Sequence, residues 1–459
     1  MDKLIIGIDL CDAYTQAAVA GRDETWVIPT VICRKKTDGG WYVGEEAYKY
    51  TLMGEGVIVD KLLSLAVKDG TATISSVKYQ GAELLRMYME RILAMIRAEY
   101  PGVPVAQLVI SLENMEMKLM DCLMGCADAL GISRDLVHIA SHTECFVYYV
   151  LSQKRDVWGG QVGMFSLSDE ALRYYELKVV QGPRQMTAWA EHEDLEEGFS
   201  LNVLDSPSGA RMADQILCAC GERLLQKKLY SSIFLTGKGF GRTDWAPEFM
   251  KQVCHRRRVF AEPSLFARGA ALKAGDYLEE RSSYPFVCLC EGKLRSTVAM
   301  EVMKRDSRIQ IALASAGESW YEARSVLEVI LDGQEEIELI ITSPQNPKQK
   351  RLVRIPLEGF PKRPPKTTRV RIAVGFLDER TMVVKIVDRG FGELFPKTDA
   401  EIRHEPDPVP SGTGDIPLFC RGAGGPSVFL PGTELRDLSS SSPGDGGFCE
   451  RAPGGIFTD

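Results

Sequence analysis

The chain has 459 residues, enough for about three domains of roughly 150 residues, and its 45% apolar and 26% charged content is ordinary for a globular protein. The formal net charge of −8 argues against a general nucleic-acid binder, which normally carries a basic excess. No apolar run approaches the ~18 residues of a membrane-spanning helix, so we expect no membrane association. The basic run at residues 255–258 (HRRR) is interpreted as a solvated loop.

Twelve cysteines are spread along the chain rather than concentrated as in a disulfide scaffold. Residues 1–3 lead directly into an apolar strand, without the charged and apolar regions of a secretory signal. Free thiols in a reducing cytoplasm are therefore expected. The C-x-C pairs at residues 218–220 and 288–290 lack the C-x-x-C spacing and second ligand pair of a structural zinc site.

The first predicted element is a buried strand that ends in a carboxylate. The strand covers residues 4–8, Asp9 follows, a tight turn occupies residues 11–14, and a second strand begins at Thr15. A buried strand that delivers one carboxylate into a turn is a common way to hold a metal–phosphate group. It is also a common start of any α/β sheet, in which case Asp9 only forms the turn.

Strands and helices then alternate, which is the order of an α/β protein. The predicted helices cover residues 82–98, 116–130, 143–151 and 210–225, and the predicted strands cover 26–34, 107–112, 138–140, 163–167, 173–179 and 232–235. Helix 82–98 places Leu85, Met89, Ile92 and Ile96 on one stripe, which we expect to face the core.

Two further features follow the last of these strands. Gly237, Lys238 and Gly239 form a predicted turn, and residues 263–274 (PSLFARGAALKA) form a predicted helix rich in small residues. We expect the small residues of this helix to allow close packing on the sheet; they are Gly269, Ala270, Ala271 and Ala274.

From about Ser283 the pattern changes to β structure. Strands at 326–331 and 336–342 enclose Asp332-Gly333, which predicts a hairpin, and further strands follow at 351–357, 368–374 and 381–387. From about residue 405 onward Pro, Gly and Ser dominate without periodicity. This tail buries too little apolar surface to offset its ordering entropy and is expected to be disordered.

Several motifs, in order along the chain, resemble the superfamily of actin, sugar kinases and DnaK-type chaperones, and within it a bacterial DnaK-like family. Residues 7–10 match the G-I-D-L of its first phosphate loop, and residues 28–47 match a chaperone segment that ends in V-G-E-x-A. Residues 263–274 match the P-x-x-A-V-A-R-G-A-A-L-x-A helix, and residues 355–390 match a stretch of the chaperone substrate-binding β-sandwich.

The resemblance implies an α/β fold, with a two-lobed actin/DnaK-type nucleotide-binding domain over residues 1–282. This domain is followed by a chaperone-like β-sandwich over residues 283–404 and by the disordered tail over residues 405–459. It also implies two phosphate-binding hairpins that face a common cleft, with ATP or ADP and Mg²⁺ as cofactor. The implied cofactor-binding residues are Asp9, Asp12, Thr15, Gly237, Lys238 and Gly239, with Asp9 also the metal ligand.

The cleft sequence departs from the family pattern. Residues 11–14 (CDAY) replace Gly-Thr-Thr-Asn, residues 166–170 (SLSDE) replace the Asp- and Gly-rich second hairpin, and His142 takes the place of a functional glutamate. Backbone approach to phosphates needs glycine or small residues. Like charges ~4 Å apart repel by about 4 kcal/mol at an effective dielectric of ~20, so carboxylates in both turns oppose a polyphosphate.

We therefore expect weak or absent ATP hydrolysis and assign no catalytic residue. His142 is interpreted as a packed or hydrogen-bonded histidine, and Cys11 as an inert small residue, since the sequence reveals no histidine partner for it. The favoured function is a chaperone-related or scaffolding protein whose β domain binds a protein or peptide. The alternative is an active ATPase that couples nucleotide state to the β domain. A sugar or small-molecule kinase is disfavoured because the β domain resembles chaperones.

Overall fold

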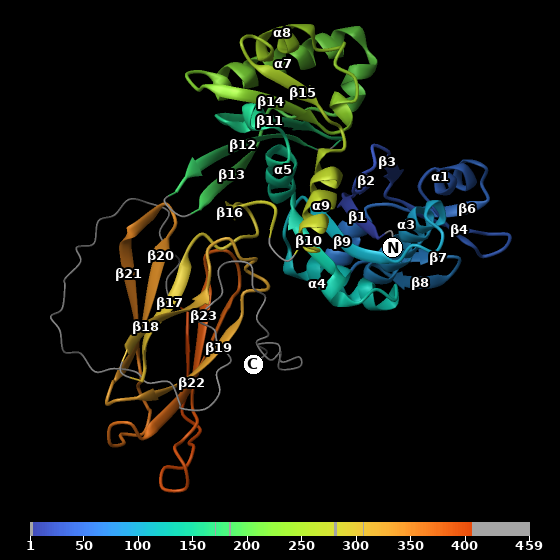
Figure 1. Cartoon of the computed structure of the whole chain (residues 1–459). Coiled ribbons are helices and arrows are strands. Elements are labelled where there is room, and N and C mark those ends of the chain that lie inside the picture. Colours follow the sequence, from blue (N-terminus) through green and yellow to red (C-terminus); the bar gives the residue numbers. More distant parts are fainter. Residues whose placement is uncertain (1–2, 170, 183–184, 280–281, 306, 406–459) are drawn as a thin grey trace. The chain divides into compact units, whose positions relative to one another are not determined.

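The computed structural model describes residues 3–169, 171–182, 185–279, 282–305 and 307–405 (Figure 1). The chain divides into a first unit, residues 1–291, and a second unit, residues 292–459. The expected domain boundary at residue 282 is therefore placed too early. The reason is β16 (Phe286–Leu289), which pairs in parallel with β13 (Met186–Asp194) and so completes a sheet of the first unit.

The first large sheet has five strands in the order β10-β9-β1-β2-β3. β1, β2 and β3 are antiparallel neighbours, whereas β9 and β10 run parallel to β1. Parallel neighbours need long crossover connections, which helices provide here. The strands are β1 (Leu4–Leu10), β2 (Tyr14–Val19), β3 (Thr25–Pro29), β9 (Val105–Leu112) and β10 (Val137–Ser141).

The second large sheet repeats this strand order and adds β16 at one edge, giving β15-β14-β11-β12-β13-β16. β11, β12 and β13 form the antiparallel set, and β14 and β15 run parallel to β11. The remaining strands of this sheet are β11 (Gln161–Leu167), β12 (Leu172–Gln181), β14 (Tyr230–Thr236) and β15 (Arg258–Ala261). The first unit thus contains the same five-strand arrangement twice.

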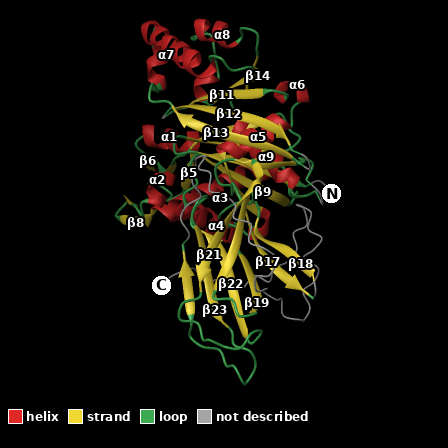
Figure 2. Ribbon diagram, turned by 90° about the vertical axis from the view of Figure 1, so that its left-hand side faces the viewer, coloured by secondary structure: helices red, strands yellow, loops and turns green. Residues whose placement is uncertain are grey.

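Helices α5 (His142–Leu151) and α9 (Leu265–Asp276) lie between the two large sheets (Figures 1 and 2). They share one hydrophobic core with residues of both sheets. α9 approaches β1 so closely that a Cβ atom on Gly7 would lie 2.2 Å from the carbonyl oxygen of Ala267 and from the amide nitrogen of Ala271. Gly269 instead packs on α5, because its Cβ would lie 2.1 Å from the carbonyl oxygen of Cys145. The expectation that Gly269 faces the sheet is wrong in that detail.

Smaller elements complete the first unit. The predicted strand over residues 26–34 is interrupted after Pro29, and its two halves, β3 and β4, belong to different sheets. The predicted core stripe of α3 is confirmed, since all four of its residues are buried. The strands are β4 (Ile32–Lys35), β5 (Trp41–Val43), β6 (Gly56–Val59), β7 (Thr71–Ile74) and β8 (Val77–Gln80). The helices are α1 (Gly44–Leu52), α2 (Leu62–Val67), α3 (Gly81–Glu99), α4 (Met117–Ala129), α6 (Arg155–Trp158), α7 (Pro207–Leu225) and α8 (Pro247–Val253), with 3₁₀ turns at Arg134–Leu136, Leu201–Asp205 and Lys238–Phe240.

Over its described residues, the second unit forms two four-stranded antiparallel sheets, ordered β18-β17-β20-β21 and β19-β22-β23-β24. Side chains along β22 alternate between buried and half-buried, as in sheets that cover a core with one face. The strands are β17 (Thr297–Lys304), β18 (Ser307–Ala314), β19 (Ser325–Leu331), β20 (Glu336–Ser343), β21 (Asn346–Pro356), β22 (Thr368–Phe376), β23 (Met382–Asp388) and β24 (Glu401–His404).

The predicted hairpin around Asp332-Gly333 is wrong. β19 pairs with β22, while β20 pairs with β17 and β21. Gly333 has a φ of +85°, so the dipeptide does turn the chain, but it directs the chain from one sheet to the other. A turn signal identifies where the chain reverses and not which strand becomes the partner.

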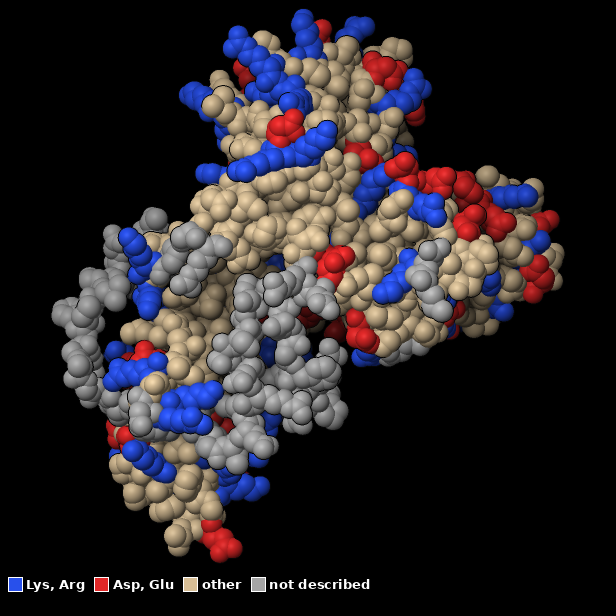
Figure 3. All heavy atoms as spheres, in the orientation of Figure 1, with Lys and Arg blue, Asp and Glu red and all other residues tan. Residues whose placement is uncertain are grey.

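The expected disordered tail covers residues 405–459, and all of it after Glu405 lies outside the described residues. Among the residues that are described, no helix is both long enough and apolar enough to cross a membrane. Lys and Arg side chains gather over the region of α7 and α8 on the face shown in Figure 3. The basic run at residues 255–258 is exposed except for the half-buried Arg257, which agrees with its interpretation as a solvated segment.

Candidate functional site

The first strands of the two large sheets end at turns that line one small cavity. In the turn after β1 the Cys11 amide donates a hydrogen bond to the Tyr14 carbonyl, and in the turn after β11 the Ser168 amide donates to the Ala171 carbonyl. Residues of both turns line the cavity, so the two turns face each other across it. The cavity encloses about 20 Å³, room for roughly one water molecule. Its lining residues are Cys11, Ala13, Tyr14, Glu113, His142, Ser166, Ser168, Ala171, Arg173, Tyr175 and Phe266.

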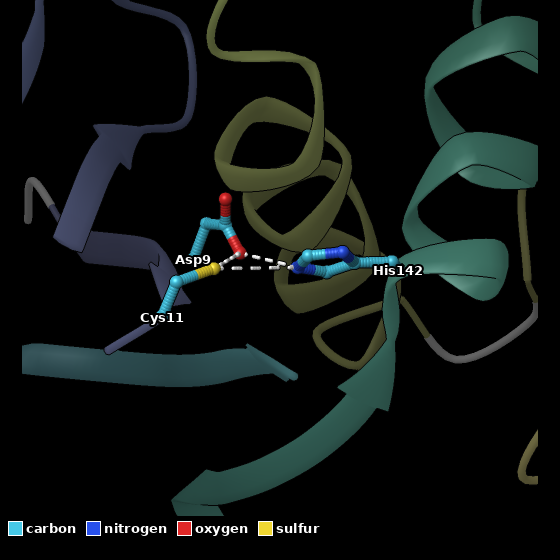
Figure 4. Close-up of side chains that lie close together, drawn as sticks. All are labelled: Asp9, Cys11 and His142. Carbon is cyan, nitrogen blue, oxygen red and sulfur yellow. Dashed lines mark hydrogen bonds and ion pairs between the residues drawn. The ribbon is translucent and has the colours of Figure 1, made fainter. Parts of the chain in front are cut away.

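Asp9, Cys11 and His142 form a compact cluster beside this cavity (Figure 4). The Nε2 atom of His142 lies 2.7 Å from Oδ1 of Asp9. The Sγ atom of Cys11 lies 3.8 Å from the same carboxylate oxygen and 4.0 Å from Nε2 of His142. Three side chains of different chemistry thus present one donor atom each to a common point.

Rigid elements hold this cluster in place. Asp9 belongs to β1, where it is opposite Ser111 of β9, and its side chain is 1% exposed. His142 is the first residue of α5, and the preceding Ser141 caps that helix by accepting a hydrogen bond from the Glu144 amide. The imidazole of His142 stacks on the ring of Phe266 from α9, with centroids 3.9 Å apart. The first large sheet and the helices α5 and α9 therefore restrict the imidazole of His142 to one orientation.

Arg173 is the cationic side chain of the cavity lining. It is 8% exposed, its Nη1 atom lies 2.7 Å from Oε1 of Glu113, and its Nε atom donates to the Asp194 carboxylate. Among the described residues, the buried hydroxyl of Tyr175 makes no hydrogen bond of regular geometry. One buried donor therefore borders the cavity without a well-formed acceptor, beside the ion-paired Arg173.

The cavity disfavours the ionised forms of its thiol and phenols. Burial raises the pKa of the Cys11 thiol well above its ordinary value, and the negative charge of Asp9 raises it further. Burial likewise raises the pKa of Tyr14, again with a contribution from neighbouring negative charge. For Tyr175, burial raises the pKa and outweighs the lowering effect of Arg173. The Cys11 thiol is thus not an activated nucleophile, in agreement with its interpretation from sequence.

Thr15 is a core residue and does not line the cavity. Its side chain is fully buried, its Oγ1 lies 2.9 Å from Oγ1 of Thr30, and it accepts a hydrogen bond from the Tyr88 hydroxyl at 2.8 Å. These contacts connect β2, the end of β3 and α3. The hydroxyl that we expected near a phosphate is therefore engaged inside the protein.

Asp12 binds the start of a helix. Its carboxylate accepts hydrogen bonds from the backbone amides of Leu63 (2.8 Å) and Ser64 (3.2 Å), and from the Ser64 hydroxyl. Leu63 and Ser64 lie in the first turn of α2, whose amide groups lack intrahelical partners. Asp12 thus caps α2 across a gap in sequence of about fifty residues.

The glycine-containing turn after β14 packs on the end of β11. A Cβ on Gly237, whose φ is +88°, would lie 2.5 Å from the carbonyl oxygen of Leu167, and one on Gly239 would lie 2.5 Å from the Leu167 side chain. Nζ of Lys238 lies 2.9 Å from Oδ2 of Asp169 in the second turn. Both glycines are thus required by packing, and a role of this turn in binding adenosine stays a prediction.

Sequence reasoning missed the relation between Cys11 and His142. His142 is buried, stacked and hydrogen-bonded, as expected, but it is also the histidine neighbour that Cys11 was thought to lack. A signal was present: both residues follow strands that run parallel to one another, β1 and β10, and parallel strands end at the same edge of a sheet.

Two family models match the chain. Residues 13–291 match a model described as a family of unknown function (DUF5716), C-terminal, and residues 293–407 match a domain of unknown function (DUF8552). The junction of the two matches coincides with the boundary between the two structural units. No curated protein matches the chain.

Proposed function

Since the chain belongs to the DUF5716 family, we propose a function from its site and its fold. We propose a non-catalytic scaffolding or chaperone-related protein, built on an actin/DnaK-type frame whose nucleotide cleft no longer accepts nucleotide. Its β domain, residues 292–405, binds a protein or peptide partner.

The repeated sheet of the first unit supports the proposed frame. Two sheets with the same five-strand order, separated by α5 and α9, are consistent with the two lobes that the resemblance implies. The facing turns after β1 and β11 are in the proposed frame its two phosphate hairpins. The frame alone does not decide the activity, because one fold supports many functions.

The size of the cavity between the two turns carries the functional proposal. Ligand pockets for small molecules and cofactors measure about 300–1,000 Å³. The space here is about 20 Å³ and is bordered by the Glu113 carboxylate and by His142, which is bound to Asp9. ATP or ADP with Mg²⁺ does not fit these residues, so we derive no reaction step from it.

The contacts of the side chains that were expected to bind the nucleotide support the same conclusion. Thr15 is buried among Thr30 and Tyr88, and Asp12 caps α2. A nucleotide site would need both groups free.

Titration of the full-length protein with Mg-ATP in a calorimeter tests this part of the proposal. We expect no binding heat at micromolar protein. Micromolar binding together with turnover that is lost in Asp9→Ala would instead establish the alternative, an active ATPase coupled to the β domain.

The partner-binding part of the proposal rests on an edge strand. β21 is an outer strand of its sheet, and no strand within the described residues pairs with its outer side. Exposed edges accept an extended peptide by backbone hydrogen bonding. Lys348 and Lys350 on this strand are exposed, and so is Leu352 at 49%. We therefore propose an extended peptide with acidic and apolar side chains as the ligand.

A photoreactive amino acid at position 352 tests this site in cells. We expect a defined cross-linked product from Leu352 and none from the equally apolar Leu229, which is 93% exposed in the first unit. Equal labelling from both positions would remove the support for the β21 edge.

We also propose a cytoplasmic location, which is supported by the free thiol state of the ten cysteines among the described residues.

A further inference from the structure

The donor atoms of Asp9, Cys11 and His142 all lie within 4.8 Å of one another. We propose that these three side chains bind one divalent d-block cation of the zinc class, with a water molecule as the fourth ligand. This inference does not depend on whether the cleft binds nucleotide, because it uses only the positions of the three side chains.

The geometry requires little rearrangement. Zinc binds carboxylate oxygen and imidazole nitrogen at about 2.0–2.2 Å and thiolate sulfur at about 2.3 Å, so tetrahedral donors lie roughly 3.3–3.6 Å apart. The observed separations are 2.7 Å for Asp9–His142, 3.8 Å for Cys11–Asp9 and 4.0 Å for Cys11–His142. Each therefore differs from the tetrahedral value by less than about 1 Å. Metal binding would replace the Asp9–His142 hydrogen bond and release the thiol proton.

The chemistry of the donors selects the metal. A thiolate and an imidazole favour zinc and related ions, whereas magnesium and calcium prefer oxygen ligands and keep several waters. The magnesium ion expected at Asp9 from the resemblance therefore suits this cluster poorly. Three protein ligands with one open position are also typical of zinc sites that bind water.

The adjoining cavity supplies the place for the fourth ligand. Cys11 and His142 line it, and its volume of about 20 Å³ accommodates one water molecule. The Tyr175 hydroxyl, on a fully buried side chain, lines the same cavity without a hydrogen bond of regular geometry among the described residues. A metal-bound water or hydroxide is an oxygen acceptor for this hydroxyl.

The charge around the cavity also favours a cation. Arg173, the cationic side chain in the lining, is already paired with Glu113 and Asp194. Asp9 adds a further carboxylate that is 1% exposed. Buried carboxylates need compensating charge, and a divalent ion provides it at the centre of the cluster.

Cobalt(II) titration of the reduced, metal-free, full-length protein tests the proposal. We expect one equivalent to produce a thiolate-to-cobalt charge-transfer band and the intense visible bands of four-coordinate cobalt, and we expect zinc to abolish them. Cys11→Ser should remove the charge-transfer band. It should also weaken zinc binding by at least about tenfold, the smallest effect that loss of even an outer-shell partner causes.

Cys218→Ser is the matched control. The Sγ atom of Cys218 also lies 3.8 Å from a carboxylate oxygen, that of Asp214, but it belongs to α7, away from the cluster. This variant should keep the band and the zinc affinity of the wild type. A second cluster variant, His142→Gln, should reduce the zinc affinity and the visible bands while retaining sulfur ligation.

Three outcomes would overturn the proposal. They are absence of the charge-transfer band in the wild-type protein, its persistence in folded Cys11→Ser, and its loss in Cys218→Ser. Circular dichroism establishes folding of each variant, and absence of the band from the wild-type protein overturns the proposal even if both cluster variants fail to fold. Calorimetry with Mg-ATP reports separately on the proposed function, since it involves no thiol band.

Discussion

The imidazole Nε2 of His142 lies 2.7 Å from the Asp9 carboxylate, and the two side chains are only 7% and 1% exposed. This contact joins the end of β1 to the start of α5. Removing the imidazole takes away this close donor and leaves the buried carboxylate with the weak thiol donor of Cys11, 3.8 Å away. We expect His142→Ala to lower the free energy of unfolding by about 1.5–3 kcal/mol, the value of hydrogen bonds to charged groups. Urea denaturation of the metal-free wild type and variant measures this difference in the free energy of unfolding.

His138 provides the control for this prediction. Its ring stacks on Tyr277 with centroids 3.7 Å apart, much as His142 stacks on Phe266, but its Nε2 lies near the neutral side-chain amide of Gln107. His138→Ala should therefore cost less than His142→Ala. Equal costs would mean that stacking, rather than the contact with Asp9, stabilises the protein at both positions.

The approach of α9 to β1 makes Gly7 irreplaceable. A methyl group there would lie 2.2 Å from backbone atoms of Ala267 and Ala271, which no rotamer change can relieve. We expect Gly7→Ala to destabilise the protein by at least about 3 kcal/mol, the upper end of ordinary overpacking. Thermal unfolding and the yield of folded protein report this loss.

Gly275 is the matched control because it lies in α9 itself, and a Cβ there meets no atom within 4 Å. Gly275→Ala should stabilise the protein by about 0.5–1 kcal/mol through helix propensity. If Gly7→Ala were as well tolerated as Gly275→Ala, the close packing of α9 on β1 would be wrong.

The contact of Asp12 with α2 predicts a structural effect of its substitution. Asp12→Ala removes the acceptor for the Leu63 and Ser64 amides and should cost about 0.5–2 kcal/mol, as loss of a helix N-cap does. Asp12→Asn retains an acceptor and should cost less. Amide hydrogen exchange of residues 62–67 measures the change locally. An unchanged exchange rate in Asp12→Ala would show that α2 does not need this cap.

Asp388 predicts a pH dependence of the second unit. Its carboxylate is 1% exposed and receives two hydrogen bonds from Arg363, at 2.9 and 2.8 Å. Burial acts to raise its pKa, but the hydrogen bonds from Arg363, the Gly390 amide and Thr398 outweigh burial, so the pKa lies below the ordinary value of 3.8. Because the folded-state pKa is lower than the unfolded one, this group stabilises the protein above about pH 4. That contribution is lost as the pH falls through the folded-state pKa.

Urea denaturation of the wild type and Asp388→Asn between pH 7 and pH 2 tests this dependence. We expect the variant to be less stable at pH 7 and to lose less stability on acidification. Arg363→Lys, which keeps the charge but loses the two-pronged contact, should fall between them. An acid dependence in Asp388→Asn equal to that of the wild type would contradict the assignment.

Local elements were predictable because their causes are local. The stripe of α3 follows from apolar residues at helical spacing, and β1 follows from a short apolar run that ends in an aspartate. The helix over residues 263–274 was also expected near its observed position, α9. The boundary at residue 282 and the Asp332-Gly333 hairpin were wrong, since both depended on which strand pairs with which.

The residue pattern was enough to predict the alternation of elements and to place Asp9 at the end of a buried strand. What that aspartate contacts depends on the tertiary structure, because Cys11 and His142 are 131 positions apart and meet through the parallel order of β1, β9 and β10. The tertiary structure likewise brings the Asp12 carboxylate to the start of α2 and buries Thr15 in the core. Backbone preference acts over a few residues, whereas the partner of a side chain depends on the sheet order of the whole unit.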